Sequence, residues 1–376
     1  MKRPRPLILC EHPTLLGGER SLLAAIDVVR EQIEPVLLGP AEGALAEAVA
    51  MRGIEFFPCD STDGQGRRLS QEVRREQLVR AIEAVRPTLV HANSLSMARL
   101  AGPVARSLGV ASLGHLRDIL RLSKQAIDDL NANTRLLAVS EATRRFHVEQ
   151  GLDPARVDVL YNGVDLERFR PRSRSGCLHR ELGLSETAQL VVTIGQIGLR
   201  KAPDLIPDVA AHVLRQMPET YFLMVGERWS EKDESRQLEA NLEAASERLG
   251  GHVRLLGVRS DVDRLLGEVD LLLHPARQEP LGRVLLEAAA AGTAVVATDV
   301  GGTREIFPPE LDSAVIVPKD DTAGMAEAIV ELLKDPGRRA EVSEAARRRA
   351  EARFDARVSA GRLLEYYRGV KRGGGE

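Results

Sequence analysis

Short apolar runs alternate along the chain with amphipathic stretches in which apolar residues recur at helical spacing. The runs have the length of buried strands, and the stretches between them are long enough to form helices. Parallel strands need helical crossovers of this kind, so the pattern predicts an α/β protein with parallel sheets. The expected strands are residues 6–10, 35–38, 54–57, 88–91, 110–114, 136–139, 157–161, 190–194, 220–225, 253–256, 271–274, 294–297 and 314–317.

The alternation is interrupted at residues 162–176, where turn residues and charges replace the apolar periodicity. Such a break is typical of a linker between two domains. We therefore expect one Rossmann-like domain over residues 1–171, a second over 172–355 and a helical C-terminal segment over 356–376. The other helices singled out by their spacing are residues 19–31, 72–85, 322–333 and 336–354.

The composition supports two folded domains and excludes some classes of partner. Of the 376 residues, 43% are hydrophobic and 28% are charged, so each half can bury a core. Aromatic residues make up only 3%, Trp229 is the single tryptophan, and the net charge is −3. These values argue against an aromatic-rich carbohydrate-binding sheet and against nucleic acid as a partner. A P-loop and a complete dinucleotide fingerprint are both missing from the sequence.

The cysteines and the N-terminus indicate a cytoplasmic protein. Cys10, Cys59 and Cys177 lack metal-binding or redox spacing, so we expect free thiols in a reducing compartment. The first apolar run is short for a secretory signal, and no run reaches the roughly 18 residues of a membrane span. Arginines at residues 67–80 leave peripheral contact with the inner face of the membrane open, although interspersed glutamates favour a solvated helix face.

Candidate chemistry is densest between Glu279 and Glu305. A buried strand leads into a polar loop, and a helix is expected to begin at about Gly282. The amides at such a helix start lack intrahelical acceptors and suit an anionic phosphate. Glu279 precedes this helix and could bind sugar hydroxyls, while Glu287 lies inside it and could reach a ribose. The alternative is that Glu279 complements the helix dipole and that Glu287 is a solvated helix residue.

This stretch resembles family four of the retaining GT-B glycosyltransferases, which use nucleotide-sugar donors. The resemblance rests on the Glu-x7-Glu arrangement and on the Glu-Ala-x-Ala-Ala-Gly-x-Ala-Val-Val-Ala-Thr-Asp-Val-Gly-Gly-x-Arg-Glu run that follows. It implies that Glu279 contacts the transferred sugar and that Glu287 contacts the nucleotide ribose. It also implies that backbone amides after Glu279 hold the diphosphate, namely those of Leu281, Gly282, Arg283 and Val284.

A second match follows the first expected strand of the C-terminal half, around Gly195. The family has a Gly-Arg pair here and a lysine five residues later, which together clamp the donor diphosphate. Lys201 matches the lysine, but Gln196 stands in the position of the arginine. We expect Lys201 to bind the diphosphate together with Arg200, and the sequence leaves open whether Arg200 compensates for Gln196. Surface solvation is the alternative for this Arg-Lys pair.

Two further matches lie in the N-terminal half. Gly17 and Gly18 open a helix after the first strand, where the family has a glycine turn that faces the donor phosphates; an ordinary βα turn is the alternative. His115 follows the fifth expected strand, where the family carries a histidine that contacts the donor sugar. The resemblance thus implies His115 and Glu279 as catalytic residues. It also implies a donor nucleotide on the C-terminal domain, an acceptor largely on the N-terminal domain, and a last helix that packs back on the N-terminal domain.

The predicted function is retaining, metal-independent transfer of a sugar from a nucleoside-diphosphate sugar to a hydroxyl acceptor, without a cofactor. Asp261-Val-Asp263 has a spacing found at metal sites of other transferases, but helix capping explains it better. One alternative is a catalytically silent homologue that serves as a partner subunit, which is suggested by Gln196 in place of the family's arginine. The other alternative is a sugar-nucleotide epimerase. The sequence does not identify the sugar, the base, the acceptor, the linkage or the oligomeric state.

Overall fold

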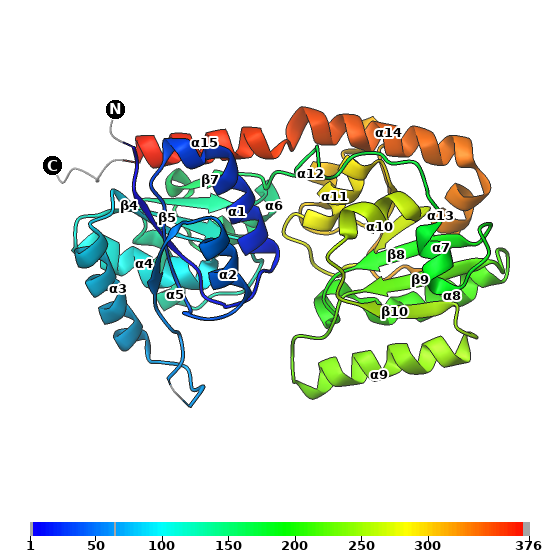
Figure 1. The fold of residues 1–376 in the computed structure, drawn as a ribbon, viewed down its shortest axis with the longest axis horizontal. Coiled ribbons are helices and arrows are strands. Elements are labelled where there is room, and N and C mark those ends of the chain that lie inside the picture. The colour runs from blue at the N-terminus through cyan, green and yellow to red at the C-terminus, as the bar shows by residue number, and fades with distance from the viewer. Residues whose placement is uncertain (1–2, 64, 371–376) are drawn as a thin grey trace. The chain divides into compact units, whose positions relative to one another are not determined.

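The computed structural model describes residues 3–63 and 65–370, which fold into two units. Unit 1 comprises Met1–Gly163 and Ala356–Glu376, and unit 2 comprises Val164–Asp355. The division therefore falls between Gly163 and Val164, upstream of the boundary after residue 171 that the sequence indicated. Each unit contains one parallel sheet flanked by helices (Figure 1). The expected end of the last helix, residues 371–376, lies outside the described residues.

The sheet of unit 1 has seven strands in the order β3-β2-β1-β4-β5-β6-β7, and neighbouring strands pair in parallel. Helices or longer loops connect the successive strands, as parallel pairing requires. The strands are β1 (Pro6–Leu9), β2 (Val36–Gly39), β3 (Glu55–Pro58), β4 (Leu89–Ala92), β5 (Ala111–Leu116), β6 (Arg135–Ala138) and β7 (Val157–Val159). The helices are α1 (Gly17–Val29), α2 (Ala44–Met51), α3 (Gln71–Val85), α4 (Leu95–Ser107), α5 (Lys124–Asn131), α6 (Glu141–Glu149) and α15 (Ala356–Gly369).

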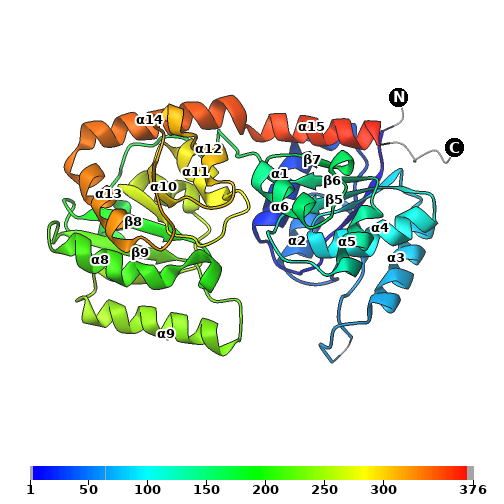
Figure 2. The same ribbon diagram turned by 180° about the vertical axis from the view of Figure 1, so that it is seen from behind.

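Successive side chains of β1 bury themselves on opposite faces of this sheet. Leu7 and Leu9 pack in a core with α3, α4 and α5, whereas Ile8 packs in a second core with α1, α2 and α15. Figure 2 shows α3, α4 and α5 gathered beside the sheet of unit 1. Because strand side chains alternate and both faces are covered, β1 is apolar at every position rather than at every second one.

The C-terminal helix α15 belongs to unit 1 although the whole of unit 2 precedes it in the chain. Its buried side chains, Ala360, Leu363, Leu364 and Tyr367, share a core with α1. The helix begins against the segment after β7, where a Cβ atom on Gly163 would lie 2.3 Å from the Cα of Ala356. Only glycine permits this close approach, so Gly163 sets how tightly α15 docks.

The sheet of unit 2 has six strands in the order β10-β9-β8-β11-β12-β13, and its neighbouring strands also pair in parallel. Its strands are β8 (Gln189–Ile194), β9 (Thr220–Val225), β10 (Val253–Gly257), β11 (Leu271–His274), β12 (Ala294–Thr298) and β13 (Val315–Val317). Its helices are α7 (Cys177–Leu182), α8 (Ile206–Leu214), α9 (Asp233–Arg248), α10 (Val262–Glu268), α11 (Arg283–Ala291), α12 (Thr303–Ile306), α13 (Thr322–Lys334) and α14 (Pro336–Arg353).

Each sheet has a point where the strand order reverses. In unit 1 this point lies between β1 and β4, and in unit 2 it lies between β8 and β11. Connections leave the two adjacent strands in opposite directions there, so a crevice opens at their carboxyl ends, where such sheets usually bind ligands. The loops after β1, β4, β8 and β11 are therefore the expected positions of ligand-binding residues.

The observed strands confirm the expected ones with small shifts at their ends. One shift changes the setting of a candidate residue: β5 runs on to Leu116, so His115 lies inside the strand rather than just after it. The extra residues pair with β6, where His115 lies opposite Leu137. The histidine is therefore held by a sheet, which restricts its backbone more than a loop would.

The close approach at Gly163 gives a test of how α15 is docked. Gly163→Ala should lower the free energy of unfolding of unit 1 by about 1–3 kcal/mol, because the added methyl group meets backbone that cannot move aside. Gly361→Ala is the matched control: it lies within α15 with nothing within 4 Å of its Cβ position, so it should be neutral or slightly stabilising.

Urea unfolding followed by hydrogen exchange of unit 1 amides measures the effect of both variants. Fluorescence of Trp229, which lies in unit 2, reports separately on the other unit. Equal stability of the two variants in unit 1 would show that the contact of Gly163 with Ala356 does not limit docking.

Candidate functional site

In unit 2, the expected cations and the first glutamate follow the two strands at the switch point. Lys201 ends the 3₁₀ turn η3 (Leu199–Lys201), which follows β8, and Glu279 lies in the loop between β11 and α11. Although 78 positions separate them in the chain, the Lys201 ammonium donates a hydrogen bond to the Glu279 carboxylate. Residues that sequence spacing could only propose separately therefore form one cluster.

The Glu279 carboxylate is buried and held from several sides. Its side chain is 6% exposed, and its Oε2 atom contacts Nζ of Lys201 and lies 2.9 Å from Nε2 of His274. Nη1 of Arg200 lies 4.0 Å from Oε1. Burial alone would raise the pKa of Glu279, but the charge of Lys201 and the hydrogen bond from His274 outweigh burial and hold the pKa below its usual range. Glu279 is therefore ionised at neutral pH.

The backbone of Glu279 is fixed by the glycine pair after β12. The amide of Gly302 donates to the carbonyl of Glu279 at 3.0 Å. Gly301 has φ of +53°, and a Cβ atom there would lie 1.8 Å from the same carbonyl oxygen. These glycines therefore hold the Glu279 loop at a distance that no side chain would allow.

Arg277 is a residue that the sequence reasoning missed. Its guanidinium bonds both carboxylate oxygens of Asp204, at 2.9 and 2.6 Å, and Asp320 at 2.6 Å. It also donates to the carbonyl of Leu199 at 3.3 Å, and its amide donates to the carbonyl of Arg200 at 2.9 Å. The hydrogen bond with Asp204 is the main reason why the pKa of Arg277 is raised. Arg277 thus joins the loop that carries Lys201 to the loop that carries Glu279.

The start of α11 forms the next part of the cluster. Gly282 precedes the helix with φ of +102°, and Leu281 and Val284 are buried beside it. Glu287 is buried rather than solvated, and its carboxylate accepts a hydrogen bond from Nε of Arg283 at 2.7 Å. The alternative of a solvated Glu287 is therefore wrong for this structure, and the guanidinium of Arg283 is paired with Glu287 at the helix start.

Gln196 and Arg200 differ in what they contact. Gln196 is exposed in the loop after β8, and no polar contact of its side chain is seen with the described residues. Arg200 approaches Glu279 and is placed by its carbonyl contact with Arg277. Of these two residues, Arg200 is the one that adds positive charge next to Lys201.

In unit 1, Gly17 and Gly18 form the first turn of α1, and the side chain of Glu19 caps it by accepting the Leu16 amide at 3.2 Å. A Cβ atom on Gly18 would lie 3.2 Å from Cδ of Arg117. Both glycines therefore begin a helix, as expected, and Gly18 lies against a half-buried arginine, Arg117, that the sequence reasoning did not single out.

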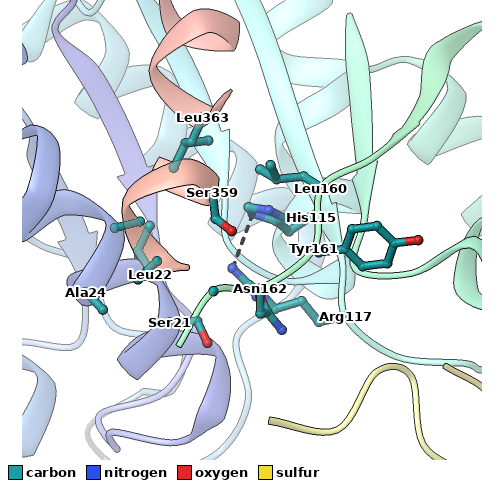
Figure 3. A pocket seen from close by; sticks show the side chains of 13 residues that line it. Ser21, Leu22, Ala24, His115, Arg117, Leu160, Tyr161, Asn162, Ser359 and Leu363 are labelled. Atoms are coloured by element: carbon teal, nitrogen blue, oxygen red, sulfur yellow. Dashed lines mark hydrogen bonds between the residues drawn. The ribbon is translucent and has the colours of Figure 1, made fainter. Parts of the chain in front are cut away.

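Arg117 organises the residues around His115. Its guanidinium donates to Oδ1 of Asn93 at 2.8 Å and to Oδ1 of Asn162 at 2.8 Å, and lies 3.4 Å from Nδ1 of His115. His115, Arg117 and Asn162 line part of a small pocket of about 30 Å³, where they lie close together and Ser359 of α15 lies near them (Figure 3). His115 is thus part of a rigid polar cluster within unit 1.

The aspartates at residues 261 and 263 act as ion-pair partners, which corrects the expectation of helix capping. Asp261 makes no capping hydrogen bond to α10; its carboxylate pairs with Arg259 at 2.8 Å. Asp263 pairs with Arg168 and Arg172 at 3.1 and 3.2 Å. Over residues 3–63 and 65–370, no group of three or more His, Cys, Asp or Glu side chains is arranged to hold a metal ion.

The Arg-rich stretch of unit 1 is paired with acidic side chains. Arg68 and Arg74 both approach Glu11, at 2.6 and 3.5 Å, and Arg75 pairs with Asp129 at 3.0 Å. This pairing lowers the charge that the stretch offers to an anionic surface. In the part of the chain that the structure describes, none of the helices has the length and apolar character needed to cross a membrane.

Both halves of the chain match known family models. Residues 17–168 match the model described as Glycosyltransferase Family 4, and residues 177–349 match the model described as Glycosyl transferases group 1. The second match takes in both strands of the switch point of unit 2, whereas the first begins after β1, at the start of α1.

Among related sequences are two D-inositol 3-phosphate glycosyltransferases. The protein from Salinispora arenicola is 37% identical over 57% of this chain and 50% of its own length. The protein from Rhodococcus jostii is 32% identical over 64% of this chain and 52% of its own length. This chain thus spans about half the length of these relatives.

Solved structures share the fold over almost the whole chain. Anabaena Alr3699/HepE, in complex with UDP and glucose, superimposes with a TM-score of 0.85, at 22% identity over 98% of this chain and 100% of that chain. A glycosyltransferase from Rickettsia africae gives a TM-score of 0.83 at 16% identity, over 100% of both chains. The expected GT-B arrangement of two Rossmann-like sheets is thereby confirmed.

Proposed function

This chain belongs to glycosyltransferase family 4, and from that premise we propose that it transfers a sugar from a nucleoside-diphosphate sugar to a hydroxyl acceptor, with retention of anomeric configuration. The observation that carries the proposal is the cluster of Lys201, Arg200 and Glu279 beside the start of α11. It combines two cations and helix amides, which suit a diphosphate, with a carboxylate that suits sugar hydroxyls.

The proposed donor site uses the cations to stabilise the leaving group. Negative charge grows on the diphosphate as the bond from the sugar carbon to its phosphate oxygen breaks, and positive groups held in place stabilise that charge. In the described structure Lys201 is neutralised by Glu279. We infer that a bound diphosphate takes over this ammonium and that the freed Glu279 oxygen turns to the hydroxyls of the sugar.

Retention is proposed to proceed on one face of the sugar ring. The carboxylate of Glu279 keeps its contact with His274 when the diphosphate takes over Lys201, which lowers its nucleophilicity and argues against a covalent sugar intermediate on this residue. The acceptor oxygen would form its bond to the sugar carbon on the side from which the diphosphate leaves. The acceptor proton would pass to the departing phosphate oxygen, so the step needs no further base and no metal ion.

The names of similar proteins indicate which donor and acceptor to test first. Alr3699/HepE is named in complexes with UDP and UDP-glucose, which makes UDP-sugars the first donors to test. The related proteins are named for D-inositol 3-phosphate, which makes it the first acceptor to test. We propose that unit 1, with Gly17, Gly18 and His115, supplies the acceptor side.

The rival functions differ from this proposal in turnover. A silent partner subunit would bind no donor, or would bind it without releasing nucleotide. An epimerase would release or convert the sugar nucleotide without any acceptor. An acceptor-dependent release of nucleoside diphosphate therefore distinguishes the three.

Incubation with UDP-, GDP- and ADP-sugars and a panel of hydroxyl acceptors should give acceptor-dependent release of nucleoside diphosphate from one donor class. The rate should be unchanged by EDTA, because cationic side chains and helix amides supply the positive charge. Proton NMR of the product should show the anomeric configuration of the donor. Turnover that is abolished by EDTA and restored by Mg²⁺ or Mn²⁺ would overturn metal independence, and an inverted product would overturn retention.

Glu279→Gln and Glu287→Gln should change different kinetic constants. Glu279 is proposed to contact the reacting sugar, so its replacement should lower kcat by at least about tenfold while nucleotide binding persists. Glu287 is proposed to contact the unreactive ribose, so its replacement should raise the donor KM by about ten- to a hundredfold with little change in kcat. Steady-state kinetics and titration with the product nucleotide measure both effects.

The control for both variants is Glu327→Gln, an exposed glutamate on α13 of the same unit. It should leave kcat, KM and thermal stability unchanged. An unchanged kcat in Glu279→Gln, or normal nucleotide affinity in Glu287→Gln, would show that the role proposed for that residue is wrong.

Arg200 is proposed to supply the charge that Gln196 lacks. Arg200→Ala should weaken nucleoside diphosphate binding about tenfold, and Gln196→Arg added to that variant should recover most of the loss. Arg215→Ala, at an exposed position after α8, is the control. Calorimetric titration measures the affinities; unchanged binding in Arg200→Ala would show that Lys201 acts without a second cation.

A further inference from the structure

A chain of buried hydrogen bonds runs from the C-terminal helix to His115. The hydroxyl of Tyr367 in α15 lies 2.7 Å from Nδ1 of His91 in β4. The other ring nitrogen of His91, Nε2, lies 2.8 Å from Nδ1 of His115 in β5. All three side chains are at most 3% exposed, so the hydrogen bonds between them are shielded from bulk water.

Arg117 favours one direction of these hydrogen bonds. Two directions satisfy the chain itself, since each histidine can carry its hydrogen on either ring nitrogen. Nη2 of Arg117, however, lies 3.4 Å from Nδ1 of His115, and a guanidinium can only donate. Although this contact is long, a cation beside Nδ1 favours a lone pair there over a hydrogen. His115 therefore accepts at Nδ1, His91 donates from Nε2, and Tyr367 donates to Nδ1 of His91.

The same arginine sets the orientation of the neighbouring amide. Oδ1 of Asn93 accepts a hydrogen bond from Arg117 at 2.8 Å, so the amide nitrogen points the other way. That nitrogen is buried without a partner among the described residues, and it lies 3.8 Å from the Cβ position of Gly18. Asn93 and His115 thus both turn acceptors toward Arg117 and leave N–H groups for another partner.

Both histidines stay neutral across the physiological range. Burial, together with the nearby charge of Arg117, lowers the pKa of His91 to about 3 and that of His115 well below its usual value. The other titratable groups that face this cluster are Tyr367, whose pKa burial raises, Cys10, whose pKa burial also raises, and Glu19 and Asp118, which act on Arg117. Arg117 itself keeps a pKa of about 10 and remains charged.

We propose that Tyr367 and His91 hold His115 as the tautomer with hydrogen on Nε2, so that unit 1 presents a neutral N–H donor to a substrate oxygen. The proposal deepens the transferase function above and rests on it for the identity of that oxygen, a hydroxyl oxygen of a substrate. Nε2 of His115 makes no contact that would satisfy it among the described residues, and His115 lines the pocket of Figure 3. Tyr367 is then a positioning residue that acts through His91.

The assignment has a chemical consequence for the reaction. A histidine whose Nε2 carries the hydrogen, and whose Nδ1 accepts from two neighbours, has no lone pair available for the acceptor proton. His115 therefore orients the substrate and does not act as a base. This agrees with a displacement in which the departing phosphate oxygen receives that proton.

The tautomer can be observed without any substrate. In the full chain labelled with ¹⁵N-histidine, two-dimensional ¹H–¹⁵N spectra should show hydrogen on Nε2 and a bare Nδ1 for both His91 and His115, unchanged from pH 8 to pH 5.5. The assignments come from spectra of His91→Gln and His115→Gln. Hydrogen on Nδ1 of His115, or titration of either ring in this range, would overturn the proposal.

Tyr367→Phe tests the positioning role, with Tyr366→Phe, the adjacent and half-buried tyrosine of α15, as the matched control. Loss of the Tyr367 hydroxyl removes the donor that stabilises a lone pair on Nδ1 of His91, so His91, and with it His115, should begin to populate the other tautomer. The transfer kcat should fall about three- to tenfold, with the donor KM nearly unchanged. Tyr366→Phe should change neither the spectrum nor kcat.

The outcomes separate this proposal from the function on which it rests. A wild-type spectrum and kcat in Tyr367→Phe would overturn the positioning role even if the protein is an active transferase. A protein that turns over no sugar nucleotide would overturn the transferase function, while the spectra would still decide the tautomer. A fall in kcat without a change in the spectrum would show that Tyr367 acts through packing of α15, and would also overturn the proposal.

Discussion

The buried negative charge of Glu279 is the constraint on which the described site of unit 2 depends. An ionised carboxylate removed from water costs several kcal/mol unless it is paired and hydrogen-bonded. Lys201 and His274 meet that requirement. Lys201 can do so only because Arg277 ties its loop to the loop of Glu279, and Glu279 is within reach only because Gly301 lets two backbone segments touch. Removing any one of these supports would leave the same charge with fewer partners.

The two units stabilise their polar clusters in different ways. In unit 2, opposite charges face one another, so a new anion can compete for the cations without creating a buried charge that was not there before. In unit 1, Arg117 is surrounded by neutral acceptors, Asn93, Asn162 and His115, which it orients without being neutralised. One cluster is therefore suited to exchanging an ion, and the other is suited to holding fixed hydrogen-bond donors.

The expected strands and the residues that follow them could be predicted because both depend on local pattern. Buried parallel strands are apolar at every position, which makes them recognisable in the sequence. Lys201 and Glu279 come soon after two such strands, so the sequence already placed both residues near the carboxyl ends of the strands. The chain from Tyr367 to His91 could not be predicted, since 276 positions separate its members and no periodicity links them. Arg277 and Arg117 were missed for a related reason. An arginine that follows a strand gives the same local sequence pattern whether its side chain faces water or joins two loops.

Asp261 and Gln196 show that a local sequence pattern does not by itself identify the contacts in the folded protein. An aspartate before a helix is usually a cap, yet Asp261 pairs with Arg259 instead, because a guanidinium two residues away offers stronger hydrogen bonds than a helix amide. At Gln196 the sequence lacks a cation where its family has one, and the neighbouring turn η3 brings Arg200 toward the same carboxylate that Lys201 binds. A binding site of this kind needs positive charge at a given point in space, and the residue that supplies it can stand at different positions in the sequence. A cation elsewhere in the same loop can therefore supply the charge when the backbone of that loop is fixed. The backbone at Arg200 is fixed because its carbonyl accepts a hydrogen bond from the amide of Arg277.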